Sequence, residues 1–173
     1  AVEGITISAG LPEEIRTGEL YTSTIRVDDP SQVRGLSMTF PYDNNQLEVV
    51  SIEAGDMFDA DNSFTFNNVG ESSFVIDGVM LNAMNRFSNS TVATVTYRAQ
   101  SNGSLEMADP VLDVRDFTNS QMSVEFSAAY MPTTAIPQAF QMAQNYPNPF
   151  NPTTTINLSL PVASDWHVNV YNV

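Results

Sequence analysis

Acidic side chains are the groups in this sequence that could do chemistry, because its 173 residues include 20 Asp and Glu, one His and no Cys. Four oxygen donors fall close together, at Asp56, Asp59, Asp61 and Asn62. Hard oxygen donors are the ligands that Ca²⁺ prefers, although this segment lacks the glycine and the distal Glu of an EF-hand loop. The segment is therefore interpreted either as a calcium site or as a solvated acidic loop, and no other cofactor is predicted.

The same composition argues against catalysis. His167 is the single histidine, and a Ser-His-Asp mechanism needs a histidine to move the proton. We expect His167 to be a surface residue, because it alternates with apolar residues along a predicted strand. The absence of Cys excludes thiol nucleophiles and thiolate zinc sites. Carboxylate pairs could serve a glycosidase, but the sequence singles out no such pair. We predict that the protein is not an enzyme and has no catalytic residues.

The charge of the chain limits the classes of partner that it can bind. The formal net charge is −14 and only six residues are Lys or Arg, whereas nucleic-acid binding needs clustered basic residues. No apolar run approaches the roughly 18 residues of a membrane-spanning helix. We therefore expect no nucleic-acid partner and no membrane insertion. The start Ala1-Val2-Glu3 is typical of a mature N-terminus after signal cleavage, which predicts a secreted protein in the extracellular space or on the outer cell surface.

The elements that would position these groups are short strands. Apolar and polar residues alternate with period two, and Gly, Asn, Asp and Pro separate the runs about every ten residues. The runs cover residues 5–7, 20–27, 36–40, 47–52, 64–66, 74–76, 92–97, 111–114 and 122–126. This spacing is typical of an all-β sandwich.

The order of motifs in this region resembles the cohesin domain. The motifs are Gly18-Glu19-Leu20-Tyr21, Phe40-Pro41-Tyr42-Asp43, the run from Leu47 to Phe58, and Val92-Ala93-Thr94-Val95-Thr96-Tyr97-Arg98-Ala99. The resemblance covers residues 4 to about 129. It implies a nine-stranded jelly-roll sandwich over residues 1–130, related to some carbohydrate-binding modules. In cellulosomes such domains bind dockerins, and the duplicated calcium loop of a dockerin is missing from this chain.

Aromatic residues leave a carbohydrate-binding module as an alternative. A flat sugar-binding platform needs several rings on one face, and the sandwich region contains no Trp. Tyr21, Tyr42, Tyr97 and Tyr130 are the candidates. Tyrosine at a strand edge also serves as half-buried packing, so polysaccharide binding and packing both remain open.

A proline-rich linker follows over residues 131–152. Each proline fixes its own φ and favours extended backbone in the residue before it, so no helix runs through this segment. We predict a stiff spacer, interrupted by Ala139–Ala143 as a strand or a single turn in which Phe140 anchors the chain.

The end of the linker resembles the start of the C-terminal sorting domain of type IX secretion cargo. The motif comprises Asn145, Tyr146, Pro147, Asn148, Pro149, Phe150, Asn151 and Pro152. The resemblance implies export, and residues 153–173 as the first two strands of an incomplete immunoglobulin-like domain. One strand alternates Ile156, Leu158 and Leu160 with polar residues, and the other alternates Trp166, Val168 and Val170. Because two strands alone are marginal in water, we expect these apolar side chains to be covered by the rest of this chain, by a neighbouring molecule or by residues beyond Val173. A docked tail and a simple truncation of the domain both remain open.

These observations predict a non-catalytic, secreted or cell-surface module for extracellular assembly or adhesion. Its partners would be proteins, including further copies of the same chain. An extended apolar segment can add as a strand to the sheet edge of another copy, and repetition of this contact would produce a filament. Two alternatives remain, which are a carbohydrate-binding module of a larger secreted enzyme and a cohesin-type receptor for a dockerin-like partner.

Overall fold

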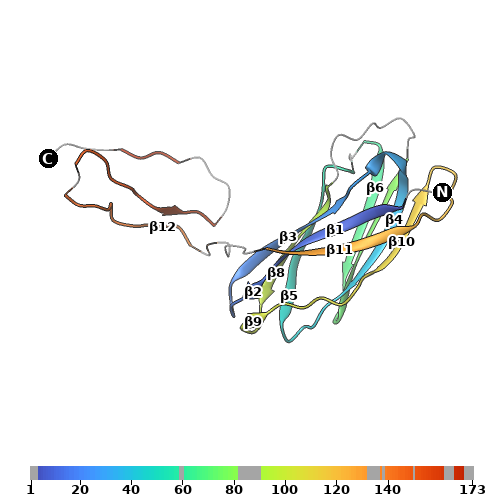
Figure 1. Cartoon of the computed structure of the whole chain (residues 1–173), viewed down its shortest axis with the longest axis horizontal. Helices are drawn as coiled ribbons and strands as arrows, with labels where there is room; N and C mark the ends of the chain where they lie inside the picture. The colour runs from blue at the N-terminus through green and yellow to red at the C-terminus, as the bar shows by residue number, and fades with distance from the viewer. Residues whose placement is uncertain are drawn as a thin grey trace. The chain divides into compact units, whose positions relative to one another are not determined.

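The computed structural model describes residues 4–58, 61–81, 91–131, 137, 139–149, 151–161 and 166–169. The chain divides into two compact units, residues 1–134 and residues 135–173. The first unit is a sandwich of two sheets that lie face to face (Figure 1). None of the described residues forms a helix long and apolar enough to cross a membrane.

The larger sheet has five strands. They are β1 (Ile5–Pro12), β3 (Leu20–Val27), β5 (Leu47–Ala54), β8 (Thr91–Ala99) and β11 (Val124–Met131). Their order is β11-β1-β3-β8-β5, in which β1 is parallel to β11 and the other pairs are antiparallel. In β1 the side chains alternate between buried and half-buried up to Gly10, which is the period-two pattern of a strand with one face on a core.

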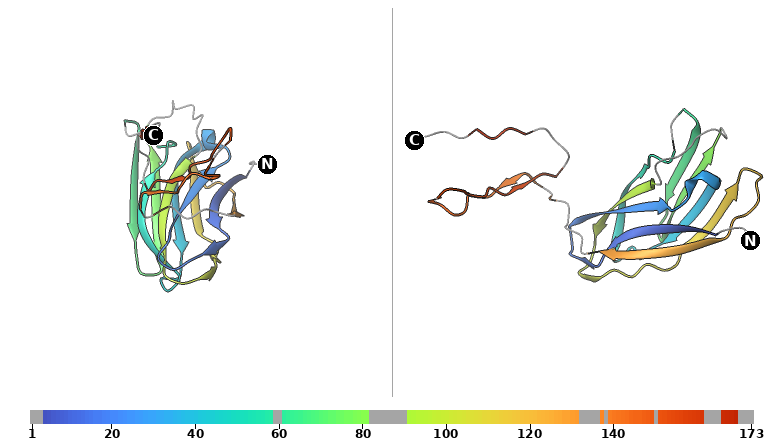
Figure 2. Two further views of the ribbon diagram at one scale, coloured as in Figure 1. Left: turned by 90° about the vertical axis from the view of Figure 1, so that its left-hand side faces the viewer. Right: turned by 45° about the horizontal axis from the view of Figure 1, so that its top comes forward.

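The smaller sheet has four strands. They are β4 (Val33–Pro41), β6 (Ser63–Val69), β7 (Ser73–Met80) and β10 (Val111–Asp116). All neighbours are antiparallel in the order β10-β4-β7-β6. Figure 2 shows the two layers from further sides. A 3-10 turn, η1 (Pro30–Gln32), precedes β4, and β2 (Glu14–Ile15) pairs with β9 (Gly103–Ser104).

Aromatic rings join the two sheets in the core. Phe40 of β4 stacks on Phe74 of β7 with ring centroids 5.1 Å apart, and it meets Phe126 of β11 edge to face at 5.9 Å. Tyr97 of β8 lies 6.3 Å from Phe74. Beneath β7, the ring of Phe58 occupies the space where a Cβ at residue 78 would stand, so Gly78 is required for close packing.

The predicted all-β sandwich is confirmed, and the nine strands of six or more residues within the described ranges match the expected number. The observed strands extend beyond some of the predicted runs. The first strand continues to Pro12, and the last strand of the sandwich continues to Met131. Alternation is weakest at these strand ends, where pairing with a neighbour decides the length.

The second unit is a hairpin rather than an extended spacer. Strand β12 (Gln141–Met142) pairs with β13 (Leu158–Ser159), and Tyr146 and Thr155 exchange two backbone hydrogen bonds of 2.9 Å. The prolines of the sequence motif lie in the loop between these arms. Thr154 Oγ1 donates to the Pro147 carbonyl at 2.9 Å and accepts from Asn145 Nδ2 at 3.1 Å, which closes the loop.

Two further expectations for this unit differ from the structure. The side chain of Phe140 is exposed and does not anchor the chain. The predicted strand over residues 166–170 is not formed at residues 166–169, and Val170 lies outside the described residues. A strand needs a partner that supplies ladder hydrogen bonds, and no described residue pairs with 166–169.

Candidate functional site

The side of the four-stranded sheet that faces away from the core is called the outer face. Leu36, Met38 and Phe40 of β4 are buried, so the alternate residues point outward. The register places the outward residues in three rows across the sheet. The rows are Arg115, Gly35, Val79, Phe64; then Asp113, Ser37, Asp77, Phe66; then Val111, Thr39, Val75, Asn68. The outer face therefore combines charged, small and aromatic side chains.

A hollow of about 630 Å³ lies on this face, lined by residues of all four strands together with Asn119 of the turn after β10. Gly35 lies between Arg115 and Val79 and contributes no side chain. A Cβ at residue 35 would meet only ordinary contacts, 3.5 Å from the Gly78 carbonyl oxygen and 3.8 Å from Val79 Cγ2. Packing therefore does not require this glycine, and its missing side chain leaves the hollow open.

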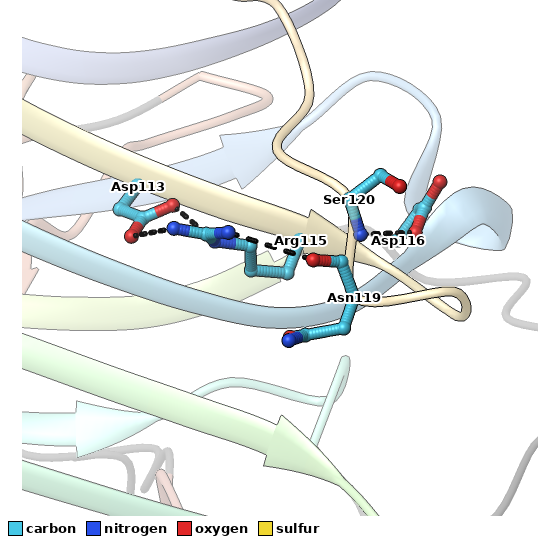
Figure 3. Close-up of polar contacts among 5 residues, drawn as sticks. All are labelled: Asp113, Arg115, Asp116, Asn119 and Ser120. Atoms are coloured by element: carbon cyan, nitrogen blue, oxygen red, sulfur yellow. Dashed lines mark hydrogen bonds and ion pairs between the residues drawn. The ribbon is translucent and has the colours of Figure 1, made fainter.

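An ion pair fixes one wall of the hollow (Figure 3). Arg115 Nε donates to Asp113 Oδ1 at 2.8 Å, and Nη2 donates to Oδ2 at 3.0 Å. This two-point geometry holds the guanidinium in one orientation. The hydrogen bonds to Asp113 and its negative charge raise the pKa of Arg115. The pair is therefore an ordered, nearly neutral feature on the outer face.

Hydrogen bonds hold the turn after β10, and Figure 3 draws the one between Ser120 and Asp116. Asp116 Oδ1 accepts hydrogen bonds from Thr118 Oγ1 at 2.7 Å and from the backbone N–H groups of Thr118 and Ser120, both at 2.8 Å. These bonds lower the pKa of the Asp116 carboxyl. Asn119 adopts a left-handed φ of 64°, which asparagine tolerates better than most residues. Its carbonyl oxygen accepts a long 3.5 Å hydrogen bond from Arg115 Nη1.

Exposed apolar side chains lie on the outer face, and one of them, Phe64, lines the hollow. The exposed fraction is 61% for Phe64, 53% for Phe66 and 72% for Val111. Large apolar groups gathered on one uncovered face mark an interaction surface more often than scattered exposed residues do. The arrangement offers shape and apolar area, with a few charges at fixed positions, for binding another molecule.

The predicted calcium ligands are only partly described. Asp56 and Asp61 are exposed, Asn62 is half-buried, and Asp59 lies outside the described residues. Within the described ranges no group of three or more His, Asp or Glu could hold a metal ion. Calcium binding at this segment stays a prediction.

The predicted tail and tyrosine residues have mixed positions. Ile156, Trp166 and Val168 are exposed, whereas Leu158 and Leu160 are half-buried. The sorting-motif residues of the proline loop are exposed, with Asn145 half-buried and Phe150 outside the description. Tyr21 and Tyr97 are buried, so they cannot form a sugar platform. The Tyr21 hydroxyl instead donates to Glu19 Oε2 at 2.9 Å.

The sequence did not identify the hollow. Alternation along residues 111–115 and 74–79 could have placed their side chains on one face of a strand. Local patterns do not reveal that Arg115 lies opposite Gly35, or that Phe64 lies opposite Val79, because register between distant strands is a tertiary property.

Comparison with known proteins identifies the fold. A non-cellulosomal cohesin from Archaeoglobus fulgidus matches with a TM-score of 0.57 and 16% identity, over 72% of this chain and 86% of that chain. The sixth cohesin of Acetivibrio cellulolyticus scaffoldin B, in complex with a Cel5 dockerin, matches with a TM-score of 0.56 and 13% identity, over 75% and 100%. A type I cohesin–dockerin complex from Clostridium thermocellum gives a TM-score of 0.55 and 12% identity, over 75% and 100%.

No curated protein matches the chain. The family model described as "Cohesin domain" matches residues 5–127, which is most of the chain and all but the ends of the sandwich. Cohesin domains are non-catalytic modules for protein–protein interaction, in agreement with the absence of a catalytic constellation from the sequence. On these grounds the chain belongs to the cohesin domain family.

Proposed function

We propose that the outer face, centred on the hollow at Gly35, docks a dockerin-like protein. The observation that carries this proposal is a sheet face with a hollow lined by Phe64 and Val79, on which Phe66 and Val111 are also exposed. Two of the similar solved structures, from A. cellulolyticus and C. thermocellum, are cohesins in complex with dockerins. The proposal assigns this chain the same class of partner.

The hollow is suited to an apolar side chain of the partner. Phe64 and Val79 offer apolar walls, and the absence of a side chain at Gly35 leaves its centre free. Full burial of a Leu or Ile side chain contributes roughly 1.5–3 kcal/mol. Asp113 already holds Arg115 in place, so little side-chain entropy is lost there when the partner binds.

The charge of the chain favours a partner with a basic surface. At a net charge of −14, long-range attraction would steer such a partner toward the sandwich. Asp77 on the outer face would then meet a basic side chain, while Arg115 is already neutralised by Asp113. Association should slow as salt concentration rises, because salt screens exposed charges.

Calorimetric titration with a panel of dockerin domains tests the proposal. We expect at least one domain to bind in a 1:1 ratio, and Gly35→Leu to weaken its binding at least tenfold by filling the hollow. Gly4→Leu is the matched control, because it makes the same change at the start of the other sheet, where a Cβ would lie 3.4 Å from the Ser123 carbonyl oxygen. Equal affinity of the wild type and Gly35→Leu would refute docking at the hollow.

We also propose that the chain is exported and acts in extracellular assembly. The proline loop supports a role as a sorting signal, because Tyr146 is 81% exposed and its neighbours from Pro147 to Pro149 are exposed as well. A secretion machinery could read such a loop directly. In a host with a type IX system, replacement of Tyr146 and Pro147 by Ala should retain the protein inside the cell envelope. Unchanged export of this variant would contradict the sorting role.

Self-association is the form of assembly that the second unit favours. Trp166 and Val168 are 55% and 43% exposed, and they alternate with His167 and Asn169 in a segment that pairs with no described strand. A segment of this pattern can complete its hydrogen bonds on the sheet edge of another copy. Sedimentation analysis across a range of concentrations should reveal oligomers, and a monomer at every concentration would contradict the proposal.

A further inference from the structure

The two sheets end in four edge strands that differ in how well they are protected. These edges are β5 and β11 in the larger sheet and β6 and β10 in the smaller one. Natural edges avoid unwanted pairing by means of charged side chains, Pro or bulges. Strand β5 carries Glu48 and Glu53 and has a register shift between Val49 and Ser51. Strand β10 carries three charged residues and also has a register shift. Strand β11 carries Glu125.

Strand β6 lacks these protective features. Its sequence, Ser-Phe-Thr-Phe-Asn-Asn-Val, contains no charge and no Pro. All seven residues pair with β7 in unbroken register, from Ser63 opposite Met80 to Val69 opposite Phe74. Phe64 and Phe66 stand exposed on the outer face. A regular, uncharged edge with exposed aromatic residues is a template for addition of another strand.

We propose that β6 receives the segment Trp166–Asn169 of a second copy as an added strand. The inference deepens the proposed self-association and names its receiving edge. Among the described strands β6 is an edge, so residues 64–69 offer backbone N–H and C=O groups on the side away from β7, and residues 166–169 pair with no described strand. Strand addition would satisfy both sets of groups at once.

The side chains of the two segments fit this arrangement. Residues two apart in a strand point to the same side, so Trp166 and Val168 lie on one face while His167 and Asn169 lie on the other. Phe64 and Phe66 likewise share one face of β6. An added strand can therefore place its apolar pair beside the two phenylalanines, where aromatic and β-branched residues on neighbouring strands attract each other.

The distribution of charge favours the second unit of another copy, and not the sandwich of that copy, as the partner of the β6 edge. Of the 20 acidic residues only Asp165 lies within residues 135–173, whereas all six arginines and the other acids lie in the sandwich. Two strongly acidic sandwiches would repel each other edge to edge. A nearly neutral segment approaches β6 without most of this repulsion.

Analytical ultracentrifugation of the full chain tests the proposal with matched variants. Asn68→Lys places a charge on the edge strand, and Val75→Lys places the same charge on β7 at the register position directly opposite Asn68. We expect Asn68→Lys and the double variant Trp166→Asp/Val168→Asp each to weaken association at least tenfold. Val75→Lys should weaken it less than twofold, because β7 is not an edge.

Hydrogen exchange on the wild type provides a second measurement that needs no substitution. Amides of residues 64–69 that face away from β7 should exchange at least tenfold more slowly at concentrations where the protein associates. Association without such protection, or unaffected by Asn68→Lys, would overturn the assignment of β6 while leaving self-association standing.

Two further outcomes separate the proposals. A monomer at all concentrations would overturn self-association together with this inference, but it would not affect docking at the hollow. Protection of β6 only upon addition of a basic, strand-forming peptide would also overturn the inference, since it would identify a foreign partner as the occupant.

Discussion

Two glycines on neighbouring strands of the smaller sheet should respond in opposite ways to replacement by alanine. Gly78 of β7 is buried, and a Cβ there would overlap the ring of Phe58. Gly35 of β4 faces outward, and a Cβ there would meet only ordinary contacts. Neither residue is among the glycines with positive φ. The contrast therefore isolates packing from backbone strain.

The magnitudes follow from what each methyl group would displace. Overpacking a tight core costs about 1–3 kcal/mol, and loss of a buried Phe side chain costs about 3–5 kcal/mol. Gly78→Ala should therefore lower the free energy of unfolding by about 2–4 kcal/mol. The value depends on how far the Phe58 ring moves out of its site. Gly35→Ala should stabilise by about 0.5–1 kcal/mol, since glycine in a strand loses more backbone entropy on folding.

The stability of both variants and of the wild type is measured by urea unfolding, with circular dichroism in place of tryptophan fluorescence as the probe. The circular dichroism signal is preferable because the single Trp lies in the second unit. The midpoint should fall for Gly78→Ala and rise slightly for Gly35→Ala. Equal midpoints for the two variants would refute the packing of Phe58 against β7 and the openness of the hollow.

Further expectations concern the ion pair, Tyr97, calcium and sugar. Asp113→Ala should release Arg115 and weaken dockerin binding several-fold without unfolding the sandwich; unchanged affinity in titration would contradict a positioning role. Burial raises the pKa of Tyr97. The neutral Tyr97 hydroxyl therefore contributes its full stability below the unfolded-state pKa of about 10, and this stability is lost as the pH rises above that value. Tyr97→Phe should lessen the loss of stability in alkali, and an equally steep fall would argue against this cause. Binding of calcium by the loop around Asp61 should raise the melting temperature relative to EDTA. At a calcium concentration 100 times Kd, the free energy of unfolding should rise by about 2.7 kcal/mol. Identical melting curves would refute the site. Insoluble polysaccharide should not retain the protein, because Tyr21 and Tyr97 are buried, and retention would favour the carbohydrate-binding alternative.

Local patterns in the sequence were sufficient to predict the sandwich. Leu36, Met38 and Phe40 alternate with polar or small residues, and all three are buried in β4. The same pattern in residues 92–97 predicted β8. Period-two alternation reports which face of a strand meets the core, and this information is local.

The hollow on the outer face could not be predicted in the same way. The hollow depends on Gly35 lying between Arg115 and Val79, which are 80 and 44 positions away in the sequence. Likewise, the proline motif predicted extended backbone but not the Tyr146–Thr155 bridge that folds it into a hairpin loop. Pairing between strands determines both features, and the residues of either strand alone do not specify it.

A crystal structure of this chain with a dockerin domain that binds it tests the central claim most directly. We expect the partner to lie on the four-stranded sheet, with an apolar side chain in the hollow within about 4.5 Å of Phe64 and Val79. A partner seated on the five-stranded sheet, with the hollow left empty, would contradict the account.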